Sequence, residues 1–230
     1  MKTIAIIPAR GGSKRLPNKN ILDLGGIPLI AHSILYAQKH ADFIDGIFVS
    51  TDDPEIKRIA LAYGANVIDR PTSLSGDFEP TVSAVKHAIQ ENDTVENIVL
   101  LQPTNPLRPE NLLKDCYRTY NENQCDSLFT VSRSHQKLGK IENDCFVPFN
   151  YTAGQRSQDL APLFYENGLI YISKASIIRQ DQIMSPTAFP YIVDHMYAAI
   201  DIDTKEDFNY AAYVLDLEVQ KEATNKDNLQ

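Results

Sequence analysis

Short apolar runs that alternate with helix-patterned stretches organise the first half of the chain. The apolar runs cover residues 3–8, 44–53, 65–70 and 97–103, and helical spacing of apolar residues follows each of them before the next begins. Nearly continuous apolar runs are typical of strands buried on both faces of a parallel sheet. Strands that alternate with helices in this way indicate βαβ units with right-handed crossovers. The pattern therefore predicts an α/β fold through at least residue 121.

The alternation ends at residue 127. Runs at 127–133, 145–151 and 168–173 resemble strands without full helices between them, which predicts a β-rich insertion at about 133–165. A strand-like segment at 196–203 follows, and then a helix with Thr204 as N-cap and Asp207 in the capping-box position. We expect a single domain over 1–220 and a polar, frayed tail over 221–230.

The net charge and hydropathy of the chain exclude some functional classes. The 230 residues include 22 Lys and Arg against 30 Asp and Glu, a formal net charge of -8. A sequence-independent nucleic-acid binder needs a broad basic surface, so we expect no nucleic-acid partner. No stretch approaches the roughly 18 apolar residues of a membrane span, and the three cysteines lack metal-ligand spacing. We expect no membrane partner and a cytoplasmic location, since the N-terminal apolar run is too short for a secretion signal.

The stretch IPARGGSKRLPNKN at 7–20 concentrates cations in this acidic protein. It follows the first predicted strand, and ligands of open α/β sheets bind at the carboxyl ends of strands. Gly11 and Gly12 let backbone N–H groups approach an anion, while Arg10, Lys14 and Lys19 supply positive charge. The spacing is neither the dinucleotide-binding fingerprint nor the P-loop. The stretch therefore predicts a triphosphate site of another kind, in preference to a solvated basic turn.

A pair of carboxylates forms a second candidate group. Asp201 and Asp203 are two residues apart in the strand predicted at 196–203, so both would project from the same face. Mg²⁺ binds to one or two carboxylates together with substrate phosphates and water. Beside a triphosphate loop, the pair predicts a Mg²⁺ or Mn²⁺ site.

Three further polar side chains follow predicted strands or loops. Gln102 ends the fourth predicted strand, in a loop stiffened by prolines. Arg70 ends the third strand, where a structural role is an equal alternative to a functional one. Arg156 lies in a flexible segment, as a rim arginine or as the bidentate partner of a substrate carboxylate.

Four motifs, in order, resemble one enzyme family. They are IPARGGSK-x-x-P-x-KN, LLQPT-x-PLR, NG-x-IY and DIDT-x-x-DF, and they span residues 7–208. The chain resembles the cytidylyltransferases that activate nine-carbon sugar acids, the CMP-sialic acid synthetases and their legionaminic acid-specific relatives. The resemblance implies a Rossmann-like, mostly parallel sheet of the nucleotidyltransferase type, with helices on both faces and a small β-rich dimerisation insertion.

The resemblance also implies an activity. CMP would pass from CTP to the anomeric hydroxyl of a 2-keto nonulosonic acid, with release of pyrophosphate, in a homodimer whose insertions reach over the partner's site. The nucleotide loop is matched by Arg10, Ser13, Lys14, Lys19 and Asn20, a further triphosphate contact by Arg70, the sugar site by Gln102, Arg156 and Tyr171, and the metal pair by Asp201 and Asp203. We expect Arg10, Lys19 and Asp203 to be catalytic. One carboxylate of the Asp201 and Asp203 pair, or a metal-bound water, would take the hydroxyl proton, with Asp203 expected to lie nearer to the sugar.

Alternatives stay open at this point. Arg15 and Leu16 stand where sialic acid enzymes commonly have Gly and an aliphatic residue, and where pseudaminic acid enzymes more often have Arg-Ile. The LLQPT-x-PLR motif instead resembles the sialic and legionaminic branch. Cytidylyltransferases for pseudaminic acid or for the eight-carbon acid Kdo are therefore alternatives, although the Kdo family lacks the Lys19-Asn20 pair. A non-catalytic nucleotide-binding module is a further alternative.

Overall fold

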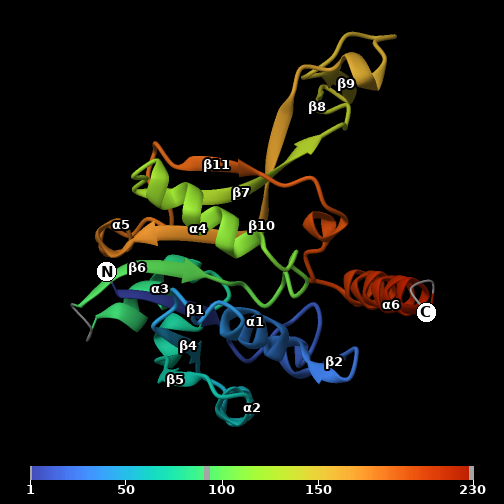
Figure 1. Cartoon of the computed structure of the whole chain (residues 1–230). Helices are drawn as coiled ribbons and strands as arrows, with labels where there is room; N and C mark the ends of the chain where they lie inside the picture. Colours follow the sequence, from blue (N-terminus) through green and yellow to red (C-terminus); the bar gives the residue numbers. More distant parts are fainter. Residues whose placement is uncertain (1, 91–93, 228–230) are drawn as a thin grey trace.

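A seven-stranded sheet forms the centre of the computed structural model, which describes residues 2–90 and 94–227 (Figure 1). The strand order is β11-β7-β10-β6-β1-β4-β5. Neighbouring strands are parallel except at β10, which is antiparallel to both β6 and β7. The predicted α/β fold with a mostly parallel sheet is confirmed. The strands are β1 (Lys2–Pro8), β4 (Gly46–Thr51), β5 (Asn66–Asp69), β6 (Val95–Leu100), β7 (Ser127–Ser134), β10 (Leu163–Lys174) and β11 (Phe189–Ile192).

Strand β1 explains why both faces of the sheet are covered. Ala5 and Ile7 pack on one face and Ile4 and Ile6 on the other, and all four are buried. A central strand that buries both faces requires a nearly continuous apolar run, as residues 4–8 provide. The first face packs against α1 (Leu29–Gln38), α2 (Pro54–Ala62) and α4 (Leu112–Glu122), and the second against α3 (Thr81–Ile89) and α5 (Ala175–Arg179) (Figure 1).

The last helix, α6 (Lys205–Asp227), begins at the predicted capping box. The Asp207 carboxylate accepts from the Thr204 backbone N–H at 2.8 Å, and the Thr204 hydroxyl accepts from the Asp207 N–H at 3.2 Å. These reciprocal bonds satisfy helix N–H groups that have no partner within the helix. The helix includes residues 221–227 of the expected polar tail, and residues 228–230 lie outside the described part of the chain.

The prediction of a strand at 196–203 is wrong. Residues 196–199 form the short 3-10 helix η4 (Met196–Ala199), and residues 200–203 belong to no strand. Their backbone groups bond to the loop after β6 instead. The Ile202 N–H donates to the Thr104 carbonyl at 2.8 Å, and the Ile200 carbonyl accepts from Asn105 Nδ2 at 2.7 Å. Because these backbone N–H and C=O groups already have hydrogen-bond partners, they do not require a neighbouring strand.

The segment between β7 and β10 forms an arm, defined here as residues 135–162, which projects away from the sheet (Figure 1). It contains the hairpin β8 (Gly139–Glu142) and β9 (Cys145–Pro148) and the 3-10 helix η3 (Ser157–Asp159). All residues of both hairpin strands are exposed. The exposed apolar side chains of the arm are Leu138, Ile141, Phe146, Val147 and Phe149.

Smaller elements lie beside the carboxyl end of β1. They are the 3-10 helices η1 (Lys19–Ile21) and η2 (Thr72–Leu74) and the hairpin β2 (Asp23–Leu24) and β3 (Ile27–Pro28). Across residues 2–90 and 94–227, no helix is both long enough and apolar enough to span a membrane.

Candidate active site

Two cavities open at the carboxyl ends of the parallel strands, where ligands of α/β sheets bind. The basic cavity, of about 200 Å³, is lined among others by Arg10, Ser13, Lys19, Asn20 and Arg70. The acidic cavity, of about 540 Å³, is lined among others by Glu166, Tyr171 and Asp201. Gln102 and Thr104 line both cavities. A ligand could therefore extend from one cavity into the other past these two side chains.

The loop after β1 is shaped by close backbone contacts. The Gly11 N–H donates to Asp52 Oδ1 at 2.9 Å, and Asn20 Nδ2 donates to the Arg10 carbonyl at 3.0 Å. A Cβ at Gly11 would lie 2.9 Å from Asp53 Oδ2, and Gly12 has a φ of +64°. Glycine is therefore required at both positions, as the sequence predicts for a loop that closely approaches a ligand.

Arg70 provides an unused buried cation at the wall of the basic cavity. Its residue is only 8% exposed, and within the described chain Nε and Nη2 have no hydrogen-bond partner. Burial lowers the pKa of this guanidinium, while Asp52 raises it. Buried polar groups in native proteins are normally paired, because an unpaired one loses its bonds to water without replacement. A guanidinium left in this state beside a cavity indicates an anion site.

Asp77 pairs with two of the predicted phosphate-binding cations, Arg10 and Lys14. Its carboxylate accepts from Arg10 Nη1 at 2.8 Å and also forms an ion pair with Lys14. Lys14, followed by Arg10, holds the pKa of Asp77 below its usual value. Lys14 itself is exposed and does not line the basic cavity. A phosphate that binds here must therefore replace Asp77 as the partner of these cations.

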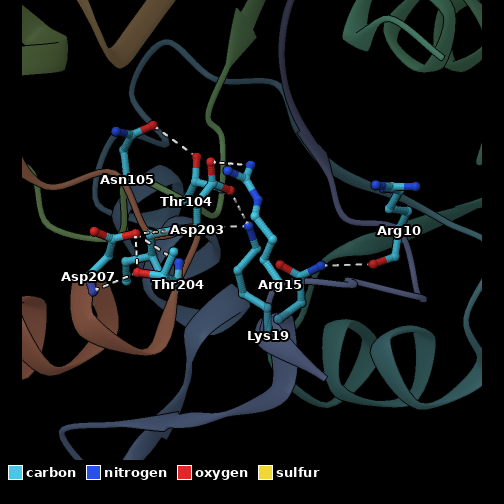
Figure 2. Close-up of polar contacts among 10 residues, drawn as sticks. Arg10, Arg15, Lys19, Thr104, Asn105, Asp203, Thr204 and Asp207 are labelled. Atoms are coloured by element: carbon cyan, nitrogen blue, oxygen red, sulfur yellow. Dashed lines mark hydrogen bonds and ion pairs between the residues drawn. The ribbon is translucent and has the colours of Figure 1, made fainter. Parts of the chain in front are cut away.

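Asp201 and Asp203 lie close together but contact different partners. Figure 2 shows Arg15 and Lys19 directed at Asp203, with Arg15 Nη2 at 2.6 Å and Lys19 Nζ at 3.1 Å from its carboxylate. Asp201 instead interacts with Thr104 and lines the acidic cavity. Desolvation raises the pKa of Asp201, the Thr104 hydrogen bond lowers it, and the Asp203 charge raises it further. Asp201, and not Asp203, is thus the carboxylate of the pair that faces the second cavity.

A divalent cation fits this pair in part. Among the described residues no group of three or more His, Cys, Asp and Glu is arranged to hold a metal. Mg²⁺ needs only one or two carboxylates when substrate phosphates complete its shell. Asp201 suits this role, because its carboxylate lines the second cavity and forms no ion pair with Arg15 or Lys19. Asp203 would first have to leave Arg15 and Lys19.

The acidic cavity depends on an irregularity in β10. Gly168 there has a φ of +76°, and a Cβ on it would lie 2.7 Å from Asn105 Oδ1. The sequence predicts Gln102 and Tyr171 at a sugar site, and the structure brings both to this cavity. Sequence reasoning missed Glu166 and Asn105, because their placement depends on this irregular backbone.

We expect Gly168→Ala to lower the Tm by about 4–10 °C, because it adds backbone strain and a clash with Asn105. Calorimetric melting measures this shift. Gly154→Ala is the matched control, since Gly154 also has a positive φ, +86°, but has no heavy atom within 4 Å of an added Cβ. Equal losses for the two variants would show that the contact with Asn105 is unimportant.

Arg156 is not brought to either cavity. It lies on the arm, where Nε and Nη2 bond to the Asp159 carboxylate at 2.7 and 3.0 Å. Within one copy of the chain, the predicted sugar-carboxylate arginine is therefore separate from the other predicted sugar-site residues.

A mostly parallel sheet with a cation-lined cavity at its carboxyl edge, and an adjoining cavity lined by carboxylates, is the arrangement expected of a nucleotidyltransferase. The sequence model of one family, described as cytidylyltransferase, matches residues 4–226. The chain belongs to this cytidylyltransferase family.

Curated relatives support the assignment. The chain is 35% identical over 222 residues to a pseudaminic acid cytidylyltransferase of Campylobacter jejuni, with 92% of this chain and 95% of the relative covered. It is also 35% identical over 215 residues to an N-acylneuraminate cytidylyltransferase of Streptococcus agalactiae, with 90% of this chain but 52% of the relative covered. The chain thus spans about half the length of the N-acylneuraminate relative.

Solved structures share the fold. A CMP:2-keto-3-deoxy-manno-octonic acid synthetase complexed with CTP superposes with a TM-score of 0.72 at 18% identity, covering 95% of this chain and all 100% of that one. A 4-diphosphocytidyl-2C-methyl-D-erythritol synthase from Anaerococcus prevotii has a TM-score of 0.66 at 17% identity, with coverage of 94% and 98%. The nucleotidyltransferase type of fold expected from the sequence is confirmed.

Proposed function

We propose that the protein transfers CMP from CTP to the anomeric hydroxyl of a nine-carbon 2-keto sugar acid and releases pyrophosphate. The observation that carries this proposal is the pair of cavities joined at Gln102 and Thr104, with the unpaired Arg70 guanidinium in one and Asp201 in the other. The names of the relatives add the class of acceptor, since they act on N-acylneuraminic and pseudaminic acids.

The basic cavity suits the triphosphate of CTP. Arg10, Lys19 and Arg70 line it together. Their charges would hold the phosphates and stabilise the charge that develops on pyrophosphate as its bond to the α-phosphorus breaks. Since these groups form no covalent bond to the substrate, catalysis consists mainly of positioning and charge stabilisation.

The acidic cavity suits the sugar acid. From here the anomeric oxygen attacks the α-phosphorus, a new carbon–oxygen–phosphorus link forms, and the hydroxyl proton must be accepted. Asp201 lies in this cavity, so its carboxylate is placed to accept the proton. We therefore assign to Asp201 the proton-accepting role that we expected of Asp203, and to Asp203 the positioning of Lys19.

Mg²⁺ or Mn²⁺ completes the proposal. Asp201 would hold it, together with the triphosphate and with Asp203 once that carboxylate is released. When bound, it would neutralise phosphate charge.

A homodimer is also part of the proposal. The acidic cavity is lined by two carboxylates and by no Lys or Arg of the described chain, yet a sugar acid carries a carboxylate of its own. Arg156 lies on the arm. The exposed apolar side chains of the arm are typical of a surface that is buried against another protein chain. An arm that packs on a second copy would bring Arg156 to the partner's cavity.

We expect Phe146→Asp, in the exposed hairpin, to convert a dimer into monomers, because a charge cannot be buried in an apolar interface. Analytical ultracentrifugation measures the mass, and the requirement for sugar acid should rise in parallel. Phe78→Asp is the matched control, since Phe78 is 100% exposed but lies outside the arm. A monomeric wild-type chain that turns over normally would contradict the dimer.

Asp77→Asn should bind CTP more tightly than the wild type, by about 2- to 5-fold, because Arg10 and Lys14 no longer need to leave a carboxylate. Calorimetric titration with CTP measures the affinity. Asp181→Asn removes a carboxylate from an exposed ion pair with Lys86 on another surface and serves as the control. Weaker CTP binding by Asp77→Asn would show that Asp77 assists the nucleotide instead of competing with it.

The direct test of the activity is pyrophosphate release in the presence of CTP, Mg²⁺ and separate N-acylneuraminic, legionaminic, pseudaminic and Kdo acids. We expect release with at least one nine-carbon acid. Release only with Kdo would shift the substrate to an eight-carbon acid. CTP binding without release from any acid would support a non-catalytic nucleotide-binding module. CTP is an intracellular nucleotide, so we place the reaction in the cytoplasm.

A further inference from the structure

Strand β10 directs Glu166 and Tyr171 at the same cavity by means of a bulge. In a regular strand, residues five positions apart face opposite sides of the sheet. Here Glu166 pairs with Val131 and Tyr171 pairs with Phe129, so five steps on β10 correspond to two on β7. The extra residues re-aim one side chain, as bulges beside binding sites do. The Tyr171 hydroxyl consequently donates a short hydrogen bond to Glu166 Oε1, and both residues line the acidic cavity.

A buried polar network fixes this bulge. Asn167 Oδ1 accepts from Thr130 Oγ1 at 2.6 Å, and Asn167 Nδ2 donates to Ser132 Oγ at 3.0 Å. The Asn167 carbonyl accepts from Asn105 Nδ2 at 3.1 Å. Thr130, Ser132, Asn105 and Asn167 are all buried. Because each amide is held from several directions, the positions of Glu166 and Tyr171 are set before any ligand binds.

The pair presents a hydrogen-bond acceptor to the cavity. Tyr171 is 6% exposed, and burial, followed by the bond to Glu166, raises the pKa of its hydroxyl, which remains a donor. Glu166 is exposed at the cavity wall, and its carboxyl group has more acceptor sites than Tyr171 uses. A carboxylate repels the acid group of a sugar acid. Glu166 must therefore contact a different part of the substrate, one that carries O–H or N–H donors.

We propose that Glu166, oriented by Tyr171, is the specificity-determining acceptor of the acidic cavity and binds one hydroxyl or amide N–H donor of the sugar acid. This role rests on the proposed cytidylyltransfer to a sugar acid. A site that is built to bond a donor rejects analogues that lack it, because the acceptor is then left unpaired. Glu166 thus selects among sugar acids by the position of one donor, while their common carboxylate is bound elsewhere.

The test is steady-state pyrophosphate release with CTP, Mg²⁺ and the acid that the wild type uses best, together with a series of its monodeoxy and N-deleted analogues. Glu166→Gln keeps the shape but presents an amide N–H where the substrate also has a donor. We expect its KM for the sugar acid to rise roughly 10- to 100-fold, with the KM for CTP unchanged. Glu96→Gln, at an exposed position of β6 outside both cavities, is the matched control.

Analogue selectivity separates recognition from a structural effect. One analogue should be poor for the wild type and should show no additional loss with Glu166→Gln, because its missing donor is the one that Glu166 binds. Tyr171→Phe should raise the KM for the sugar acid by a smaller factor. The double variant should raise this KM by less than the product of the two single factors. An unchanged sugar KM, or equal additional losses on every analogue, would overturn the role of Glu166. A wild type that uses no sugar acid would overturn the proposed function and this role with it.

Discussion

Replacing Arg70 with Met is expected to make the protein more stable and nearly inactive. Arg70 is buried with two nitrogens unpaired, so Met removes an uncompensated polar group. An unpaired buried group costs about 1–3 kcal/mol, and about 1 kcal/mol corresponds to 2–4 °C in Tm for a chain of this size. The Tm should therefore rise by a few degrees. The same change removes a desolvated charge from the triphosphate site, which should lower kcat/KM for CTP by about 100-fold or more.

Arg118→Met is the matched control for this prediction. Arg118 is exposed on α4 and forms an ion pair with Asp115, so its loss should change neither CTP turnover nor Tm by much. Melting curves and CTP saturation kinetics on the same preparations give both quantities. A stable Arg70→Met protein with normal CTP kinetics would show that the guanidinium does not contact phosphate. A destabilised one would show that it supports the fold.

Asp201→Asn is expected to lower kcat by about 100- to 1000-fold with little change in Tm. The substitution keeps the size of the side chain and its bond with Thr104 but removes the negative charge. Since desolvation already raises the pKa of Asp201, folding does not depend on that charge. Pyrophosphate release measures turnover, and electron paramagnetic resonance of Mn²⁺ with CTP measures metal binding, which should weaken.

Asp203→Asn distinguishes the two carboxylates. It removes the charged partner of Arg15 and Lys19, although Lys19 Nζ keeps its hydrogen bond to the Ile202 carbonyl at 2.8 Å, so the CTP requirement should change together with turnover. Asp42→Asn, at an exposed position outside both cavities, controls for the substitution itself. If Asp203→Asn abolished turnover while Asp201→Asn left it near normal, the roles assigned to the two residues would be exchanged.

The sheet and the anion site could be predicted from local sequence. The run at 3–8 is apolar at successive positions because β1 is central, and Gly11 and Gly12 follow it where the chain turns back beside Asp52 and Asp53. Arg10 follows β1 and Arg70 follows β5, which lie on either side of β4, so a parallel topology brings both to the same edge of the sheet. The spacing of apolar residues, and the position of the glycines and arginines directly after predicted strands, are enough to predict these features.

The second cavity could not be predicted in the same way. The residues around Asp201 alternate like a strand, but the Asn105 amide and the Thr104 carbonyl bond to their backbone instead. Glu166 and Tyr171 are five apart, and regular strand geometry would separate them. Asp77 meets Arg10 and Lys14 only because the loop after β5 folds over the cavity. Each case depends on contacts between distant segments, which spacing does not encode.

The most direct test of the central claim follows the bond that forms. The protein is incubated with CTP, Mg²⁺ and a nine-carbon sugar acid labelled with ¹³C at the anomeric carbon, and the product is examined by ³¹P and ¹³C NMR. Transfer of CMP to the anomeric hydroxyl predicts a phosphodiester signal coupled to the labelled carbon, with an equal amount of pyrophosphate. Free CMP with no coupled signal, or unchanged CTP with every nine-carbon acid, would contradict it.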